Sequence, residues 1–553
     1  MLKENLIKIY EQTFRENCDE PAFTDYFKGE TFTYLEAAGE IARLHLLFAK
    51  AGIRPGDKIA LLGRNNPRWC MAYLATITCG AVIVPILQDF HPNDIRHIIN
   101  HSESRMIFIG DNCWDDIDPA LVPGLEAAFS LTDYHCIFER EGTLLADCMA
   151  SMESLMAERY PAGFCAQDIT YPEVANDHVS LLNYTSGTTG YSKGVMLTCN
   201  NLTGNVTFAL EQNIFCRGMR ILSFLPLAHA YGCAFDFLSP LAAGAHITLL
   251  GRIPAPKVLM EAMERVRPQI ICCVPLILEK IYRKQIIPML DKSLLRMALR
   301  VPFIDTALYA QFRKRLLAAF GGEVEMFIVG GAPMNKETED FLMKIKFPLT
   351  VGYGMTECAP IISYVHWSLF KGGSCGRYIS NHIEVKVDSA DPQQIAGEIM
   401  VRGEHVMKGY YKNPEGTAAV LDADGWLHTG DMGTLDPDGT LYIRGRSKTM
   451  ILGPSGQNIY PEEIEAKLNN LYCVMESLVL ERDGKLVALA VPDYEQAETD
   501  GIAMEELDEL MQKNLAELNT LVAPYERVSK IIVYPDEFEK TPKKSIKRFL
   551  YNI

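Results

Sequence analysis

Residues 184–198 read YTSGTTGYSKGVMLT, a stretch rich in glycine, serine and threonine that ends in an apolar run. Glycine lets backbone N–H groups approach an anion, and successive N–H groups in a tight turn form a positively polarised concavity. Hydroxyl donors and the mobile ammonium of Lys193 add groups suited to phosphate. The stretch is not a Walker A loop, because that pattern requires Gly-Lys-Ser/Thr and the chain has Ser192-Lys193-Gly194. Its composition also suits a flexible polar loop, so the rest of the chain decides between the two interpretations.

Length and charge narrow the class of protein. At 553 residues the chain is too long for one hydrophobic core and should divide into two or more domains. Apolar residues make up 48% and charged residues 22% of the chain, which is ordinary globular composition. A net charge of −17 disfavours nucleic-acid binding, because neutralising phosphates requires a surplus of cations.

The cysteines and the apolar segments predict a cytoplasmic protein. None of the 15 cysteines has zinc-site spacing, so buried thiols in a reducing compartment are expected. Residues 1–17 resemble an amphipathic helix and lack the apolar core of a signal peptide. Residues 69–87 carry no charge, but Gly80 and Pro85 interrupt them, so a buried helix followed by a buried strand is expected rather than a membrane span. Peripheral contact with a membrane stays open.

Short apolar runs alternate with helical patterns over most of the chain. Continuous apolar strands separated by helices predict parallel sheets covered by helices on both faces. After about residue 375 the strands come closer together, with turn signals such as DPDG at 436–439 between them. The last hundred residues predict a small α+β domain. The apolar runs are KIALLG at 58–63, AVIVPIL at 81–87, RMIFIG at 105–110, ITLL at 247–250, QIICCVP at 269–275 and EMFIVGG at 325–331.

Further glycine-rich or charged turns follow the first one in a fixed order. A turn directly after an apolar strand is where open α/β sheets bind ligands. Glu357 ends one of these turns and could hold a hard cation such as Mg²⁺, and Asp431 could accept from a ribose diol. Each turn alone has an ordinary structural explanation, but together they supply the parts of a nucleotide site. They are PLAHAYG at 226–232, GGAPM at 330–334, VGYGMTE at 351–357, WLHTGD at 426–431 and GRSKTM at 445–450.

At this point the chain resembles the adenylate-forming enzymes, which include acyl-CoA synthetases, firefly-type luciferases and peptide-synthetase adenylation domains. The resemblance covers nearly the whole chain, and YTSGTTGYSKGV and GYGMTE are its most specific blocks. It implies an α/β fold: a large N-terminal domain, 1–444, of parallel-type sheets flanked by helices with a small β-barrel-like subdomain, and a small mobile α+β C-terminal domain, 445–553. The other matching blocks are residues 31–44, 52–75, 372–377 and 397–417.

The resemblance also implies roles for individual residues. The loop that begins at Thr185 wraps the ATP phosphates together with Lys193, and Glu357 binds Mg²⁺ with Thr185. His229 lies beside the reacting carboxylate, and Lys448 lies at the hinge between the domains. Residues 453–465 resemble the loop that lines the thiol tunnel after the C-terminal domain rotates. The remaining nucleotide-binding residues implied are Ser186, Gly187, Thr188, Thr189, Gly190, Ala332, Tyr353, Gly354, Thr356, Asp431 and Arg446.

Near the C-terminus the chain departs from the family pattern. The family usually carries its catalytic lysine in a motif like Thr-Pro-x-Gly-Lys-Ile, whereas residues 540–548 read KTPKKSIKR, with Ser545 at the lysine position. Lys543 and Lys547 would share the face of Ser545 in an extended segment, whereas loop slack favours Lys544. We expect Lys544 to act, and the choice among the three stays open.

Three functions remain to be separated. The leading one is an ATP- and Mg²⁺-dependent ligase that joins a carboxylic acid to coenzyme A, with a fatty acid favoured by PLAHAYGCAFDF at 226–237 and its small residues Gly232, Cys233 and Ala234. The second passes the same adenylate to an acyl carrier protein. The third is a protein that binds AMP or an acyl-adenylate without catalysis, motivated by Ser545.

Overall fold

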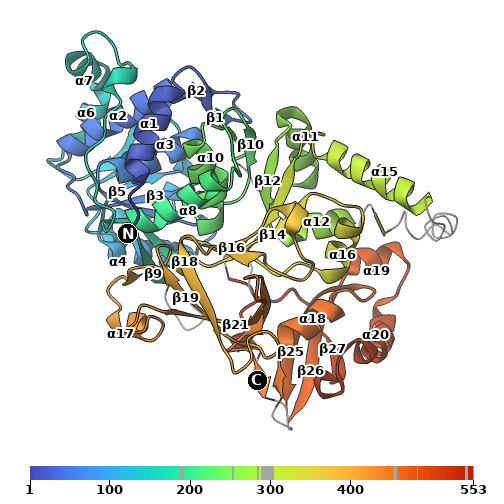
Figure 1. Ribbon diagram of the computed structural model, residues 1–553. Coiled ribbons are helices and arrows are strands. Elements are labelled where there is room, and N and C mark those ends of the chain that lie inside the picture. Colours follow the sequence, from blue (N-terminus) through green and yellow to red (C-terminus); the bar gives the residue numbers. More distant parts are fainter. Residues whose placement is uncertain are drawn as a thin grey trace.

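The computed structural model describes residues 1–185, 192–251, 255–282, 286–287, 304–452, 457–482, 484–541 and 546–551. Two large sheets with their helices form the upper part of the molecule in Figure 1, and smaller sheets from the second half of the chain lie below them. The alternation of strand and helix confirms the predicted α/β class.

The eight-stranded sheet contains the strands on either side of the hydroxyl-rich stretch. Its inner strands run parallel, while β7, β9 and β20 pair antiparallel at the two sides. Every residue of β4 is buried, as expected for a strand covered on both faces. In sheet order the strands are β20 (Gly409–Tyr410), β9 (Lys193–Thr198), β8 (Val179–Thr185), β4 (Val82–Ile86), β3 (Lys58–Leu62), β5 (Ser104–Ile109), β6 (Ala127–Ser130) and β7 (Cys136–Glu139).

The seven-stranded sheet is parallel except for its terminal strand β2. In sheet order its strands are β14 (Leu349–Val351), β13 (Met326–Val329), β12 (Ile270–Cys273), β10 (Arg220–Ser223), β11 (His246–Leu249), β1 (Pro21–Asp25) and β2 (Thr31–Thr33). One continuous hydrophobic core spans this sheet and much of the other. Among the helices that contribute to it are α1 (Leu6–Glu16), α2 (Tyr34–Lys50), α3 (Pro67–Thr78), α8 (Cys199–Glu211) and α10 (Ser239–Ala242).

The uncharged segment 69–87 folds as its sequence predicts. Helix α3 begins after Asn66, whose side chain accepts a hydrogen bond from the Trp69 amide, and Pro67 occupies the first turn, where its missing N–H costs nothing. All residues from Trp69 to Thr78 are buried, and β4 follows. In the described part of the chain, no helix is long and apolar enough to cross a bilayer.

Two antiparallel sheets form the predicted barrel-like subdomain. One has the order β15 (Tyr353–Gly354), β16 (Ile361–Tyr364), β17 (Arg377–Tyr378), and the other β18 (Ile383–Asp388), β19 (Gly397–Gly403), β21 (Leu427–Leu435), β22 (Leu441–Arg446). A bridge between Arg377 and Thr440 joins them. The DPDG turn connects β21 to β22, with Gly439 at φ +84°, a conformation that glycine adopts without steric cost.

The C-terminal part is the predicted α+β unit with cores of its own. Its three-stranded sheet is β25 (Val474–Arg482), β26 (Lys485–Pro492) and β27 (Val528–Val533), packed with α18 (Pro461–Leu468) and α20 (Leu507–Leu521). A short pair, β23 (Ile451–Leu452) and β24 (Asn458–Ile459), precedes it. The predicted domain boundary after residue 444 falls inside β22 and stays a prediction.

Candidate active site

The two ends of the hydroxyl-rich loop are the best-defined part of the candidate phosphate site. Thr185 is the last residue of β8 and Lys193 the first of β9, and the two pair directly across the antiparallel ladder. Both side chains are half-buried at the ends of their strands. The predicted phosphate ligands between them, Ser186, Gly187, Thr188, Thr189 and Gly190, lie outside the described residues.

Tyr410 joins the predicted phosphate lysine to the predicted magnesium ligand. The Lys193 ammonium lies 4.8 Å from the centroid of the Tyr410 ring, within the range of a cation–π contact. The Tyr410 hydroxyl donates a hydrogen bond of 2.8 Å to Oε1 of Glu357. Burial and the neighbouring Glu357 carboxylate raise the pKa of Tyr410, so the phenol keeps its proton. Tyr410 therefore places Lys193 and Glu357 on one continuous surface.

Buried asparagines of helix α8 hold the segment that carries Glu357. Asn205 is 1% exposed; its amide donates to the Cys358 carbonyl, 3.3 Å away, and its Oδ1 accepts from the Ile361 amide, 3.0 Å away. Asn201 donates in the same way to the carbonyls of Glu404 and Val406. Since unpaired buried amides are costly, the bonds of Asn205 fix the end of the short helix Thr356–Cys358 against α8, and those of Asn201 fix the segment 404–406.

A second corner of the site contains a buried carboxylate. Asp431 in β21 is 5% exposed; its Oδ1 lies 3.0 Å from Nε of Arg446, its partner across the ladder in β22. Its Oδ2 accepts a hydrogen bond of 2.7 Å from the Tyr353 hydroxyl. Burial raises the pKa of Asp431, and Arg446 opposes that shift. The carboxylate retains lone pairs for a diol, so this corner suits a ribose.

The residues predicted to border the nucleotide base follow the carboxyl ends of the seven-stranded sheet. Ala332 is exposed just after β13, and Gly354 is exposed in β15. A Cβ on Gly354 would lie 2.2 Å from the Pro360 carbonyl oxygen, so only glycine fits there. Thr356 is 6% exposed and so presents little surface to a ligand.

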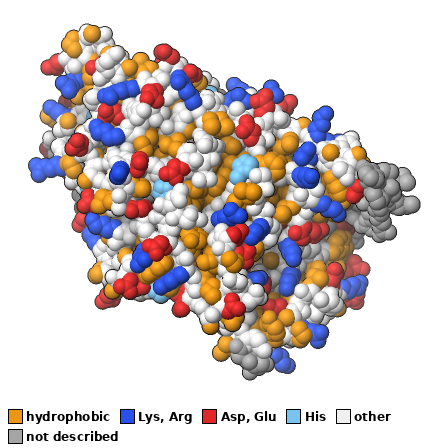
Figure 2. Space-filling model, viewed as in Figure 1, with side chains coloured by type: hydrophobic (Ala, Val, Ile, Leu, Met, Phe, Trp, Pro, Cys, Tyr) orange, Lys and Arg blue, Asp and Glu red, His pale blue; other side chains and the backbone are white. Residues whose placement is uncertain are grey.

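His229 caps a short helix at the edge of the same sheet. Its Nδ1 accepts from the Tyr231 amide at 3.3 Å, and the Tyr231 hydroxyl donates to the Ile328 carbonyl at 2.7 Å. The side chain of Asn65 bonds the Leu225 carbonyl and the Leu227 amide, which fixes the preceding turn. The imidazole is half-buried. On the face shown in Figure 2, hydrophobic side chains gather near the middle of the molecule, with Lys and Arg nearby.

The three small residues predicted to make room for an acyl chain, Gly232, Cys233 and Ala234, are buried. A Cβ on Gly232 would lie 2.6 Å from the Pro226 carbonyl oxygen, so glycine is required there by a backbone contact. Cys233 and Ala234 are each 3% exposed and pack in the main core. The expectation that these residues make room for an acyl chain stays a prediction.

Asp236, which follows the His229 turn in the sequence, is an acid in the hydrophobic core. It is fully buried in the π-helical segment Cys233–Leu238, a helix type that often marks functional sites. Oδ2 accepts from the Leu225 amide at 3.3 Å, whereas Oδ1 has no hydrogen-bond partner among the described residues. Burial raises the pKa of Asp236 to about 7.

The predicted catalytic lysine, Lys544, lies outside the described residues, together with Lys543 and Ser545. On either side of that gap, Lys540 contacts Glu476 at 2.7 Å and Lys547 contacts Glu539 at 3.6 Å. The loop predicted to line the thiol tunnel, 453–465, is described only from residue 457 onward. Lys448 is exposed in the turn after β22.

Two groups in the site were missed from the sequence. Tyr410 lies within the quoted block 397–417, but nothing in its sequence neighbourhood indicates contacts with residues 53 and 217 positions away. Asn201 and Asn205 stand in a helix that is buried from Cys199 to Ala209, and a run of amide side chains in such a helix is the one signal that could have revealed them.

The donor set fits Mg²⁺ and a nucleotide. In the described residues no group of three or more His, Cys, Asp or Glu side chains could hold a metal by itself. Mg²⁺ commonly uses one or two carboxylates together with substrate phosphates. Tyr410 binds only Oε1 of Glu357, so Oε2 is available to a metal ion.

Comparison with known proteins agrees with this geometry. The model of the AMP-binding enzyme family matches residues 10–411. Feruloyl-CoA synthase from Amycolatopsis sp is 29% identical over 528 residues, covering 93% of this chain and 92% of that protein. Long-chain-fatty-acid–CoA ligase 6 of Homo sapiens is 30% identical over 472 residues, covering 79% and 66%. The crystal structure of ATP-bound MatB from Rhodopseudomonas palustris has a TM-score of 0.76 at 23% identity, covering 99% of this chain and 98% of that one.

Proposed function

Because the chain belongs to the AMP-binding enzyme family and is an AMP-forming acid–thiol ligase, we propose that it activates a fatty acid with ATP and Mg²⁺ and transfers the acyl group to coenzyme A. The observation that carries the proposal is the contact chain from Lys193 through Tyr410 to Glu357 at the base of the hydroxyl-rich loop. These contacts bring together the predicted phosphate-binding cation, Lys193, and the predicted metal-binding carboxylate, Glu357.

In the first half-reaction a carboxylate oxygen attacks the α-phosphorus of ATP, a new O–P bond forms, and pyrophosphate leaves. Both reactants are anions, so the barrier is largely electrostatic. Lys193 offsets charge on the phosphates, and Tyr410 orients Glu357 by its hydrogen bond. Mg²⁺, held by Glu357 and the Thr185 hydroxyl, would neutralise the developing charge.

Asp431 and Arg446 would fix the nucleotide during this step. The Asp431 carboxylate accepts from the ribose hydroxyls with lone pairs that its contacts to Arg446 and Tyr353 leave free. Ala332 and Gly354 border the adenine, and His229 lies at the edge of the sheet where the acid would approach. Holding both reactants in register removes much of the entropic cost of the reaction.

In the second half-reaction the coenzyme A thiol attacks the acyl carbon and AMP leaves. One site performs two different reactions, so we propose that residues 445–553 rotate as a mobile domain, with Lys448 at the hinge. Such rotations occur on the microsecond-to-millisecond scale and often limit turnover. We propose a cytoplasmic location, which agrees with the absence of disulfides among the 15 cysteines, all of which are described.

The class of acid is the least constrained part of the proposal. The human relative is named for long-chain fatty acids and the Amycolatopsis relative for feruloyl-CoA, so relatives alone do not choose between aliphatic and aromatic acids. The Pro-Leu-Ala-His opening of residues 226–229 supports a fatty acid.

ATP–pyrophosphate exchange with matched aliphatic and aromatic acids tests the proposal. We expect exchange with fatty acids of some chain length, followed by a thioester when coenzyme A is added. Exchange without thioester would point to a carrier-protein acceptor instead. Exchange only with ferulate or coumarate would replace the fatty acid by an aromatic one, and no exchange with any acid would leave a non-catalytic binding protein.

A further inference from the structure

A cavity outside the candidate active site lies against the eight-stranded sheet. It has a volume of about 520 Å³, within the range of small-molecule sites. It lies along the amino ends of the parallel strands, where Lys58, Val82 and Val179 are the first residues of β3, β4 and β8. Thr185 stands at the other end of β8, roughly 20 Å from Val179 at the rise of an extended strand. The opposite side of the cavity, at Leu182 and Met196, lies nearer to the phosphate loop.

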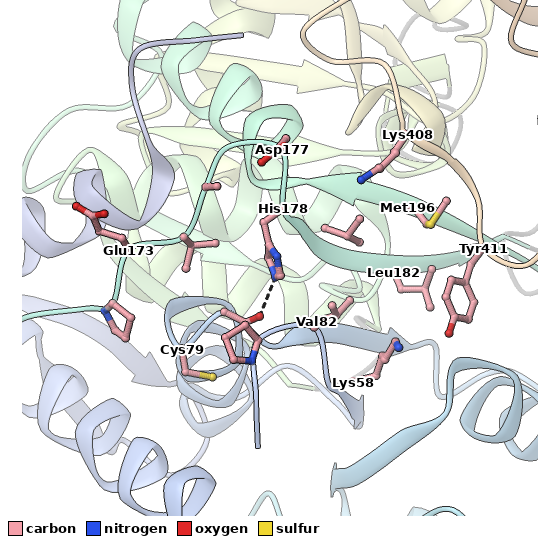
Figure 3. Close-up of a pocket in the computed structure, with 17 residues that line it drawn as sticks. Lys58, Cys79, Val82, Glu173, Asp177, His178, Leu182, Met196, Lys408 and Tyr411 are labelled. Atoms are coloured by element: carbon pink, nitrogen blue, oxygen red, sulfur yellow. Dashed lines mark hydrogen bonds between the residues drawn. The ribbon is translucent and has the colours of Figure 1, made fainter. Parts of the chain in front are cut away.

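The body of the cavity is apolar. Val82 and Leu182 are 5% and 1% exposed and form its floor together with Met196 of β9. His178 crosses the middle of the cavity, with Nε2 donating to the Gly80 carbonyl at 2.8 Å (Figure 3). This bond holds the imidazole in place, so its flat face serves as part of the wall. A ligand that fills this space must bury an apolar body.

One end of the cavity is cationic. Lys58 and Tyr411 lie near each other on one side of the cavity, and Lys408 lies on the same side but apart from them. Glu173 and Cys79 lie on the opposite side (Figure 3). The Lys58 ammonium is 5.4 Å from the centroid of the Tyr411 ring. Among the described residues, neither Lys58 nor Lys408 makes an ion pair that would occupy its charge. The carboxylates of Glu173 and Asp177 are exposed on the rim and have no such pair with either lysine.

We propose that this cavity is a second binding site, for a small organic anion with one acidic head and an apolar body. The head would lie beside Lys58 and Tyr411, with Lys408 on the same side of the cavity, and the body would lie over Val82, Leu182 and Met196. The charge complementarity selects the anion, since two ammonium groups without ion pairs among the described residues, both on one side of an apolar space, disfavour a neutral or cationic occupant.

A matched pair of probes tests the proposal directly. The fluorescent anion 1-anilinonaphthalene-8-sulfonate and its uncharged analogue N-phenyl-1-naphthylamine share the same aromatic body. Both are titrated into the full chain and into the double variant Lys58→Gln/Lys408→Gln. We expect the anion to bind roughly threefold to tenfold more weakly to the double variant, because a charge-assisted contact is lost, and the neutral probe to bind unchanged.

Lys412→Gln is the matched control. Its ammonium lies 5.1 Å from the same Tyr411 ring and pairs with Glu103 at 2.9 Å, but it does not line the cavity. This control should leave both affinities unchanged, whereas Met196→Trp should weaken both by filling the space. Anion affinity that is equal in the wild type and the double variant would overturn the proposal, as would equal loss of both probes in the double variant. Because only binding is read, the result is independent of whether the chain activates a fatty acid.

Discussion

The Tyr410 hydroxyl donates a 2.8 Å hydrogen bond to the Glu357 carboxylate while its ring lies 4.8 Å from the Lys193 ammonium. One side chain thus contacts Lys193 of strand β9 and Glu357 of the short helix Thr356–Cys358. We therefore assign Tyr410 the role of a positioning residue, which acts through Glu357.

Replacing Tyr410 with Phe should raise the Mg²⁺ concentration needed for half-maximal pyrophosphate exchange about twofold to tenfold, because one hydrogen bond of ~0.5–1.5 kcal/mol no longer orients Glu357. The cation–π contact with Lys193 is retained, so the dependence on ATP should change less. Tyr411→Phe is the control, since Tyr411 bonds the exposed Glu103 at 3.0 Å. An unchanged Mg²⁺ dependence in Tyr410→Phe would remove the positioning role.

Substitutions of Lys193 and of Glu357 should impair pyrophosphate exchange in different ways. Lys193→Ala should raise the ATP concentration required for exchange, and Glu357→Ala should lower the rate by orders of magnitude, with ~2–4 kcal/mol of transition-state stabilisation lost. High Mg²⁺ should partly restore Glu357→Gln but not Lys193→Ala. Exchange rates measured over a range of ATP concentrations and a range of Mg²⁺ concentrations separate the two effects. Wild-type rates in both variants would end the assignment of the phosphate and metal site.

Asp236 should make thermal stability depend on pH. Its folded pKa, about 7, lies above its ordinary value, so the folded state favours the protonated acid. The contribution of this acid to the free energy of unfolding is complete below about pH 4. It is lost as the pH rises through 7, at a cost of about 1–4 kcal/mol. Asp236→Asn should therefore flatten the pH dependence of Tm and raise Tm by a few degrees at pH 8. A parallel loss of Tm with pH in both proteins would assign the dependence to other groups.

Sequence patterns predicted the sheets well because their strands are short, wholly apolar runs such as KIALLG, which becomes β3 at Lys58–Leu62. A turn residue such as Asp431 could be predicted from its motif, but its contact with Tyr353 could not, since 78 residues separate the two. The buried acid Asp236 was also missed, because its neighbours read as an ordinary apolar helix. Long-range contacts and isolated buried charges leave no local pattern.

Lys448→Pro should separate the two half-reactions. The substitution fixes φ near −65° and removes an N–H, and among the described residues the Lys448 amide donates no backbone hydrogen bond. The static fold should therefore tolerate the change, whereas a rotation about this residue would be blocked. We expect one of the two half-reactions, acyl-adenylate formation or thioester formation, to keep its rate and the other to be lost. Ser447→Ala is a neighbouring control, and equal loss in both steps would place the hinge elsewhere.

The last prediction concerns the lysine displaced from the family position. Adenylation builds negative charge around the α-phosphate, and a positioned ammonium stabilises it. Ser545 cannot supply that charge, so Lys543, Lys544 or Lys547 must do so if the enzyme is active. Lys547 contacts Glu539 at 3.6 Å, a pair that partly engages its ammonium. We expect Lys544 to act.

Single alanine substitutions at the three positions distinguish the candidates. Lys544→Ala should slow acyl-adenylate formation by ~10²-fold or more, while Lys543→Ala and Lys547→Ala change it little. The thioester step from preformed acyl-adenylate should be nearly unaffected in all three, because the rotated domain would carry that lysine away from the α-phosphate. A large loss in Lys543→Ala alone would transfer the role to that residue. Three mild and equal losses would mean that a diffuse basic patch has replaced the single catalytic charge.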